Sequence, residues 1–321
     1  MADRMALILL VAALLFAVVT GANDGASLIA TNLSSKAVSP LGALCALALA
    51  VTAGPLIVGT AVATTFARGL VSFGAQGGES ALLVAVFVAM ALVMAISRLG
   101  LPTSVTQATL GAIVGVGVGR GLPVAWDSVG RALLVFALAP LAAGLLASLV
   151  ARGFAVVRVS RPARSQMRAL HAASFGAQCL GYAANDAQKM VAVMAIATGA
   201  VGVGVAARLD TQALIGLCFF GGTLLGISRL GVRLGTQLMP VRPMNAISAG
   251  FASSAAVLAS AAIGSPVSMA QSSSAALIGS EFVLESYRRV RWNQATRIAV
   301  VWATTLPTAI VIAALAGAAT R

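Results

Sequence analysis

Long apolar runs alternate with short polar gaps along the whole chain. The runs at residues 81–96, 132–150 and 299–319 contain no charged side chain. A helix needs about 20 mostly apolar residues to cross a membrane, so the chain has room for roughly ten such elements, short ones included. The short alternating segments of a membrane β-barrel are missing. The pattern predicts an all-α, polytopic transmembrane protein.

Polar residues interrupt several of these runs. The run 5–19 leads to the pair Asn23-Asp24, where a break in the helix is expected. The run 41–70 carries Gly54-Pro55, and a second break is expected there. The apolar stretch after Pro102 has only about 16 residues, which predicts a re-entrant half-helix. Broken helices at membrane depth are tolerated only where they line a cavity or are buried in protein, so the breaks indicate a site.

The polar interruptions occur twice, in the same order. Asn23-Asp24 returns 162 residues later as Asn185-Asp186. A second motif, Pro102, Ser104 and Gln107, returns 164 residues later as Pro266, Ser268 and Gln271. Ordered motifs at a nearly constant offset predict an internal duplication.

The duplication divides the chain into two halves. We expect a first transmembrane repeat over 1–155, a basic cytoplasmic linker over 156–166 and a second transmembrane repeat over 167–321. Secondary transporters have this organisation, with a site built from discontinuous helices between the repeats. The gap before the last span carries four arginines, whereas its counterpart between Arg120 and Arg131 is lightly charged. That asymmetry favours inverted halves.

The composition agrees with this class. Hydrophobic residues make up 60% of the chain, charged residues 9%, and the mean hydropathy is +0.99. The net charge of +13 does not indicate nucleic acid, because the basic residues lie in the gaps between apolar runs, as the positive-inside rule expects. We expect a multi-pass protein in the lipid bilayer of the cell membrane. The two densest basic gaps, both expected to be cytoplasmic, contain Arg152, Arg158, Arg161, Arg164 and Arg168, and Arg288, Arg289, Arg291 and Arg297.

Two carboxylates lie inside apolar stretches. Asp24 and Asp186 are two of eight acidic residues, and an intramembrane carboxylate usually faces a partner or a water-filled path. Both would repel an approaching oxyanion in a medium of low dielectric constant. A cation is therefore implied, either sodium on the aspartate and asparagine oxygens or protons on the aspartates. The alternative is that each aspartate only caps a broken helix.

Small hydroxyl residues stand at the expected starts of the short helices. Ser104, Thr106 and Ser268 lie where free backbone amides and the helix dipole favour an anion. Helix starts from both halves would together hold a tetrahedral oxyanion. Monohydrogen phosphate carries a proton that an aspartate can accept, whereas sulfate has only acceptors. Phosphate is therefore favoured, with sulfate or a related oxyanion as the alternative.

At these motifs the chain resembles the inorganic phosphate transporter (PiT) family. Gly21-Ala22-Asn23-Asp24 is similar to the first signature of that family, and Ala184-Asn185-Asp186-Ala187-Gln188-Lys189 to the second. The resemblance implies a cation-coupled phosphate symporter that works by alternating access and forms a homodimer. Gln107 and Gln271 stand where the family pattern has histidines.

The motifs and the resemblance together assign residues to two roles. Phosphate is expected to contact Asn23, Thr103, Ser104, Thr106, Gln107, Asn185, Ser268 and Gln271. The coupling cation is expected to contact Asn23, Asp24, Ser27, Asn185, Asp186 and Gln188, with Asp24 and Asp186 as ligands if it is sodium. Apart from this coupling ion, sodium or a proton, no cofactor is expected. Lys189 can either neutralise Asp186 or extend to an interface.

An intramembrane enzyme is the alternative from another class. Catalysis would need a nucleophile with a base, or metal ligands, and the sequence has one histidine and no zinc-protease or serine-hydrolase motif. Only the aspartate pair could act, as in an aspartyl protease. We therefore expect a transporter and not an enzyme.

Overall fold

The computed structural model describes residues 2–33, 38–73, 77–100, 103–156, 164–199, 205, 207–234, 242–284, 288 and 290–320. Four residues named above, Pro102, Arg158, Arg161 and Arg289, lie outside this part of the chain, as does most of the expected linker over 156–166. The proposed boundaries between the repeats therefore stay predictions.

Helices make up nearly all of the described chain. The first half contains α1 (Ala2–Thr20), η1 (Gly21–Gly25), α2 (Ala26–Leu33), α3 (Pro40–Val58), α4 (Ala61–Thr64), η2 (Thr65–Gly69), α5 (Gly78–Arg98), α6 (Val105–Arg120) and α7 (Trp126–Val156). The second half contains α8 (Arg164–Ala184), α9 (Gln188–Ala197), α10 (Leu209–Leu234), α11 (Pro243–Ala262), α12 (Met269–Leu284) and α13 (Trp292–Ala319). Within the described residues, seven segments are long and apolar enough to cross a membrane. The all-α, multi-pass prediction is confirmed.

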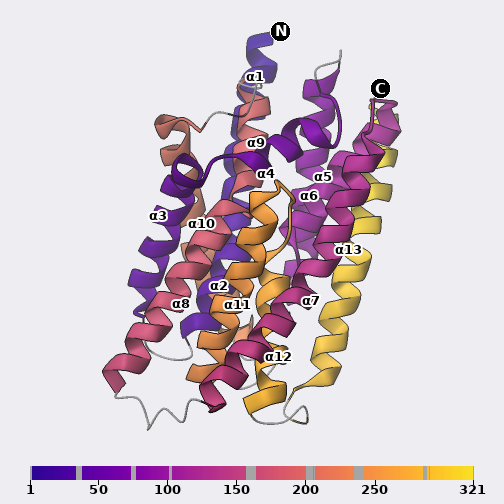
Figure 1. The fold of residues 1–321 in the computed structure, drawn as a ribbon. Helices are drawn as coiled ribbons and strands as arrows, with labels where there is room; N and C mark the ends of the chain where they lie inside the picture. Colours follow the sequence, from indigo (N-terminus) through magenta and orange to yellow (C-terminus); the bar gives the residue numbers. More distant parts are fainter. Residues whose placement is uncertain are drawn as a thin grey trace.

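The two halves run in opposite directions. In Figure 1 both termini lie at the top, α1 descends from the N-terminus, and α8, its counterpart in the second half, ascends. The short helix α6 occupies the upper part of the view and α12 the lower part, as inverted repeats require. Each short helix packs on the last helix of the other half, α6 on α13 and α12 on α7. The two halves are therefore interleaved, and the starts of α6 and α12 come together near the middle of the molecule.

The expected break at Asn23-Asp24 takes another form. The first helix widens into the five-residue π-helix η1 and continues as α2, so that it spans residues 4–32 without ending. A π-turn keeps the backbone hydrogen-bonded, here from the Ala26 amide to the Gly21 carbonyl, while it re-aims the side chains within it. In the second half the break is complete, because α8 ends at Ala184 and α9 begins at Gln188.

The second expected break lies four residues later than the sequence indicated. Pro55 remains inside α3, which ends at Val58, and the interruption falls at Gly59, whose φ of +83° lies in the left-handed region. Helices within a membrane accommodate a proline when neighbouring groups satisfy the freed backbone. Glycine adopts a positive φ without steric cost, which is why the helix stops there.

Glycines set the closest helix contacts. On α6, a Cβ at Gly111, Gly115 or Gly119 would overlap backbone atoms of α13. On α10, a Cβ at Gly222 would overlap the carbonyl oxygen of Val18 in α1. Small residues at these positions let the helix backbones touch, which is the usual basis of association in lipid.

The Gly222→Ala variant is expected to lose about 1–3 kcal/mol of stability, because α10 would have to move away from the α1 backbone. The adjacent Gly221 offers a matched control. A Cβ there meets nothing within 4 Å, so Gly221→Ala is expected to be neutral or slightly stabilising. Thermal unfolding of both purified variants measures the difference. Equal melting temperatures would contradict the close approach of α10 to α1.

Candidate functional site

The starts of α6 and α12 are capped in different ways. Ser104 precedes α6, and its hydroxyl accepts a hydrogen bond from the Gln107 amide at 3.2 Å. The start of α12 is capped from another element, because the Asp186 carboxylate accepts from the Met269 amide at 3.0 Å. Helix geometry leaves the other first-turn amides of both helices without intrahelical partners. Both helix starts can therefore still donate to an anion.

The two asparagines of the repeated motif hold the loops that lead into these helices. The Asn23 amide donates to the Thr103 carbonyl at 3.1 Å, and the Asn185 amide donates to the Ser265 carbonyl at 2.9 Å. Asn185 also accepts from the Val267 amide at 3.0 Å. Both asparagine side chains are buried. The repeated Asn-Asp motif thus fixes the loop before each short helix, with the same sequence separation of 80 residues in each half.

A buried lysine joins the two aspartates. Lys189 has no exposed surface, and its ammonium lies 2.7 Å from Asp24 Oδ2 and 3.3 Å from Asp186 Oδ1. It also donates to the Thr106 hydroxyl at 3.1 Å. The same hydroxyl donates to Asp186 Oδ1 at 3.1 Å. Asp24 belongs to the first half, and Asp186 and Lys189 to the second, so this charged cluster connects the repeats.

Several buried polar atoms beside the cluster have no partner among the described residues. Thr103 and Ser265, in the loops before the two short helices, are 2% and 8% exposed, and neither hydroxyl makes a hydrogen bond within the described chain. The same holds for Gln107 Oε1 and the Ser272 hydroxyl. Buried polar groups without partners are costly, and each indicates a place for a ligand or a water molecule.

Not every residue expected at the site takes part in this cluster. Gln188 binds the backbone, accepting from the Ala63 amide and donating to the Gly59 and Ala184 carbonyls, so it ties α9 to the break after α3. Ser27 is half-buried on α2. Ser268 and Gln271 are buried at the start of α12.

Sequence reasoning missed other buried groups. The unpartnered hydroxyls of Ser265 and Ser272 lie next to the Pro266 motif, and the run of serines after Gln271 was the available signal. Glu281 lies near the end of α12, where it is buried and accepts a hydrogen bond from Asn245, 36 residues earlier in the chain.

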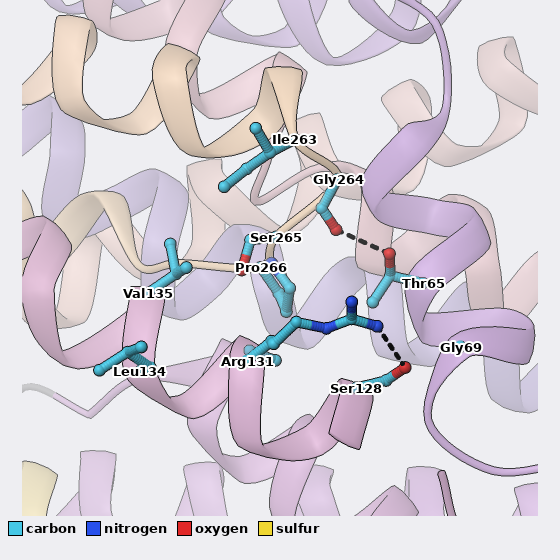
Figure 2. Close-up of a pocket in the computed structure, with 11 residues that line it drawn as sticks. Thr65, Gly69, Ser128, Arg131, Leu134, Val135, Ile263, Gly264, Ser265 and Pro266 are labelled. Carbon is cyan, nitrogen blue, oxygen red and sulfur yellow. Dashed lines mark hydrogen bonds between the residues drawn. The ribbon is translucent and has the colours of Figure 1, made fainter. Parts of the chain in front are cut away.

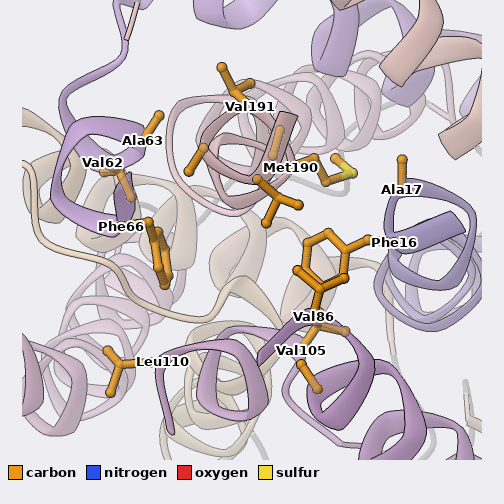
Figure 3. Close-up of a cluster of buried hydrophobic side chains, with 14 of the residues drawn as sticks. Phe16, Ala17, Val62, Ala63, Phe66, Val86, Val105, Leu110, Met190 and Val191 are labelled. Atoms are coloured by element: carbon orange, nitrogen blue, oxygen red, sulfur yellow. The ribbon is translucent and has the colours of Figure 1, made fainter. Parts of the chain in front are cut away.

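An apolar shell and a cavity flank the site. Figure 3 shows Phe16 and Phe66 of the first half packed with Met190 of α9 in the second half, close to α6. A cavity of about 450 Å³ lies between η2, the start of α7 and the loop before α12 (Figure 2). Ser265 lines this cavity, and so does Arg131, whose guanidinium donates to Ser128 at 3.3 Å. The cavity therefore reaches the loop that Asn185 holds.

The described residues contain no group of three or more His, Cys, Asp or Glu side chains placed to hold a metal ion. The site is instead two facing helix starts, unpartnered hydroxyls and a buried cluster of two carboxylates and one ammonium. Together with the inverted halves, these features are those of a polytopic membrane transporter.

The chain belongs to the phosphate transporter family, whose model matches residues 20–175 and again 158–313. The chain is 26% identical to a probable low-affinity inorganic phosphate transporter of Bacillus subtilis, covering 97% of this chain and 96% of that one. It is 32% identical to the protein of the same name in Mycobacterium bovis, covering 96% and 76%. A solved sodium-dependent phosphate transporter has the same fold, with a TM-score of 0.82, 18% identity and 99% of both chains covered.

Proposed function

We propose that this protein is a symporter that moves inorganic phosphate across the cell membrane by alternating access, driven by a sodium or proton gradient. The observation that carries the proposal is the pair of unpartnered hydroxyls, Thr103 and Ser265, in the two loops that Asn23 and Asn185 hold before α6 and α12. Together with the free first-turn amides, they form a set of donors from both halves. A tetrahedral oxyanion takes donors from several directions, which this arrangement supplies.

The carboxylates favour phosphate over sulfate. A phosphate that carries protons can donate to Asp24 or Asp186, whereas sulfate can only be repelled by them. The curated relatives that the chain matches are described as inorganic phosphate transporters. Of the residues expected to bind phosphate, Ser104, Ser268, Gln107 and Gln271 lie at the helix starts, and Thr106 is committed to Asp186 and Lys189 in this conformation.

Alternating access follows from the interleaved halves. Because the re-entrant helix of one half packs on the last helix of the other, a rocking motion of the halves moves both helix starts together. Arg131 and Ser265 line the same cavity, and a cationic side chain beside the Ser265 loop attracts anions. The resemblance at the motifs also supports a homodimer as the working assembly.

The proposal is tested by uptake of radiolabelled phosphate into proteoliposomes, with sodium and pH gradients imposed separately. We expect at least one inward cation gradient to accelerate uptake, and unlabelled phosphate to compete better than sulfate. Uptake that is indifferent to both gradients would exclude symport. Stronger competition by sulfate than by unlabelled phosphate would show that sulfate is the preferred substrate.

A further inference from the structure

The space between the two aspartates is already filled by a cation. A sodium ion shared by Asp24 and Asp186 would need the oxygens that the Lys189 ammonium contacts at 2.7 and 3.3 Å. The Thr106 hydroxyl, another oxygen that sodium would use, is the third contact of the same ammonium. An ammonium group has three hydrogens to donate, so these three oxygens satisfy it completely. The residues around this position therefore do not fit a sodium ion while Lys189 remains between them.

Most of the charge of the cluster is balanced without sodium. Two carboxylates contribute two negative charges and Lys189 contributes one positive charge. A helix N-terminus carries roughly half an elementary positive charge on its free backbone amides. The start of α12 reaches Asp186 through the Met269 amide and so offsets about half of the remaining negative charge, while the Thr106 hydroxyl on the first turn of α6 donates a neutral hydrogen bond to the same carboxylate.

We propose that Lys189 is a tethered cation that takes the place of sodium between Asp24 and Asp186, so that phosphate transport by this protein does not require sodium. This inference rests on the proposed phosphate transport and removes sodium from its possible coupling ions. Lys189 is carried by the first turn of α9, three residues after Asp186, so the ammonium cannot leave with the substrate. A sodium ion in the same position would be released in each transport cycle, whereas the lysine keeps its charge at the site permanently.

The test is phosphate counterflow in proteoliposomes at constant pH, with sodium chloride compared with choline chloride. The rate of phosphate exchange by the wild type is expected to differ less than about twofold between the two salts. The Lys189 ammonium already occupies the position between the aspartates, so added sodium has no site to bind there. Lys189→Ala opens the position, and its exchange in choline is expected to be at least about 100-fold slower because two carboxylates lose their partner. Sodium is expected to restore much of the lost exchange in this variant. Arg208→Gln, which removes an exposed cation paired with Asp210 at 3.0 Å, is the control for lost positive charge.

The results separate failure of the Lys189 inference from failure of the proposed phosphate transport. Exchange by the wild type that requires sodium overturns the inference but leaves phosphate transport standing, whereas no phosphate exchange in either salt overturns the proposed function. A folded Lys189→Ala variant that is equally active in both salts, or inactive in both, also overturns the inference. If this variant does not fold, the wild-type comparison alone decides.

Discussion

The Asp186→Asn variant is expected to lower the initial rate of phosphate uptake at least about 100-fold, equivalent to a loss of about 3 kcal/mol. The asparagine keeps an oxygen for the Met269 amide but removes the charge that faces Lys189 and Thr106. Lys189 retains Asp24 at 2.7 Å, so the protein is expected to fold. Radiolabelled uptake and thermal unfolding of the same preparation separate lost activity from lost structure.

Asp24→Asn is expected to show the same loss of uptake, and each variant is expected to lose its response to the driving cation gradient. Asp210→Asn is the matched control, because this carboxylate is exposed and bonds only its near neighbours in sequence, Arg208 and Thr211, among the described residues. Its uptake is expected to equal that of the wild type. Intact coupling in either Asp24→Asn or Asp186→Asn would remove the aspartates from the transport mechanism.

Removing both unpartnered hydroxyls, by Thr103→Val with Ser265→Ala, is expected to raise the KM for phosphate by about 100-fold or more. A hydrogen bond to a charged group contributes about 1.5–3 kcal/mol, so the loss of two such bonds amounts to about 3–6 kcal/mol. Stability is expected to be unchanged or slightly improved, since neither hydroxyl has a partner within the described chain. Uptake at a series of phosphate concentrations, with thermal unfolding alongside, measures both effects.

Thr109 and Ser260 provide the controls for this double variant. Both are buried near the same loops, but each hydroxyl donates to a carbonyl of its own helix, Val105 and Ala256 respectively. Thr109→Val with Ser260→Ala is expected to leave the KM unchanged. An equal rise in the KM of both double variants would show that the effect of Thr103 and Ser265 is one of packing and not of phosphate recognition.

The class, the duplication and the general place of the site follow from local features of the chain. Apolar runs identify spanning helices because a bilayer admits little else. The repeated Asn-Asp and Pro-x-Ser motifs predicted two short helices with a polar start, and α6 and α12 are those helices. Asn23 and Asn185 do lie beside these starts. The sequence did not indicate that they bind the loop backbone there.

Helix interruptions were placed less well. Pro55 suggested a break that falls instead at Gly59, and Asn23-Asp24 lies in a π-turn within a continuous helix. A proline or a polar pair weakens a helix locally, but neighbouring helices decide whether the freed groups find partners. The two copies of one motif even differ, since the second copy ends α8 completely.

The sequence alone thus determined an all-α transporter with two repeats, two intramembrane aspartates and phosphate as the favoured anion, because these depend on hydropathy, spacing and residue chemistry. Only the tertiary structure decided the partner of Lys189, which in sequence could equally neutralise Asp186 or reach an interface. The physical reason is distance along the chain. Asp24 and Lys189 are 165 residues apart, and the inverted packing of the halves brings them to 2.7 Å, with one ammonium between two carboxylates.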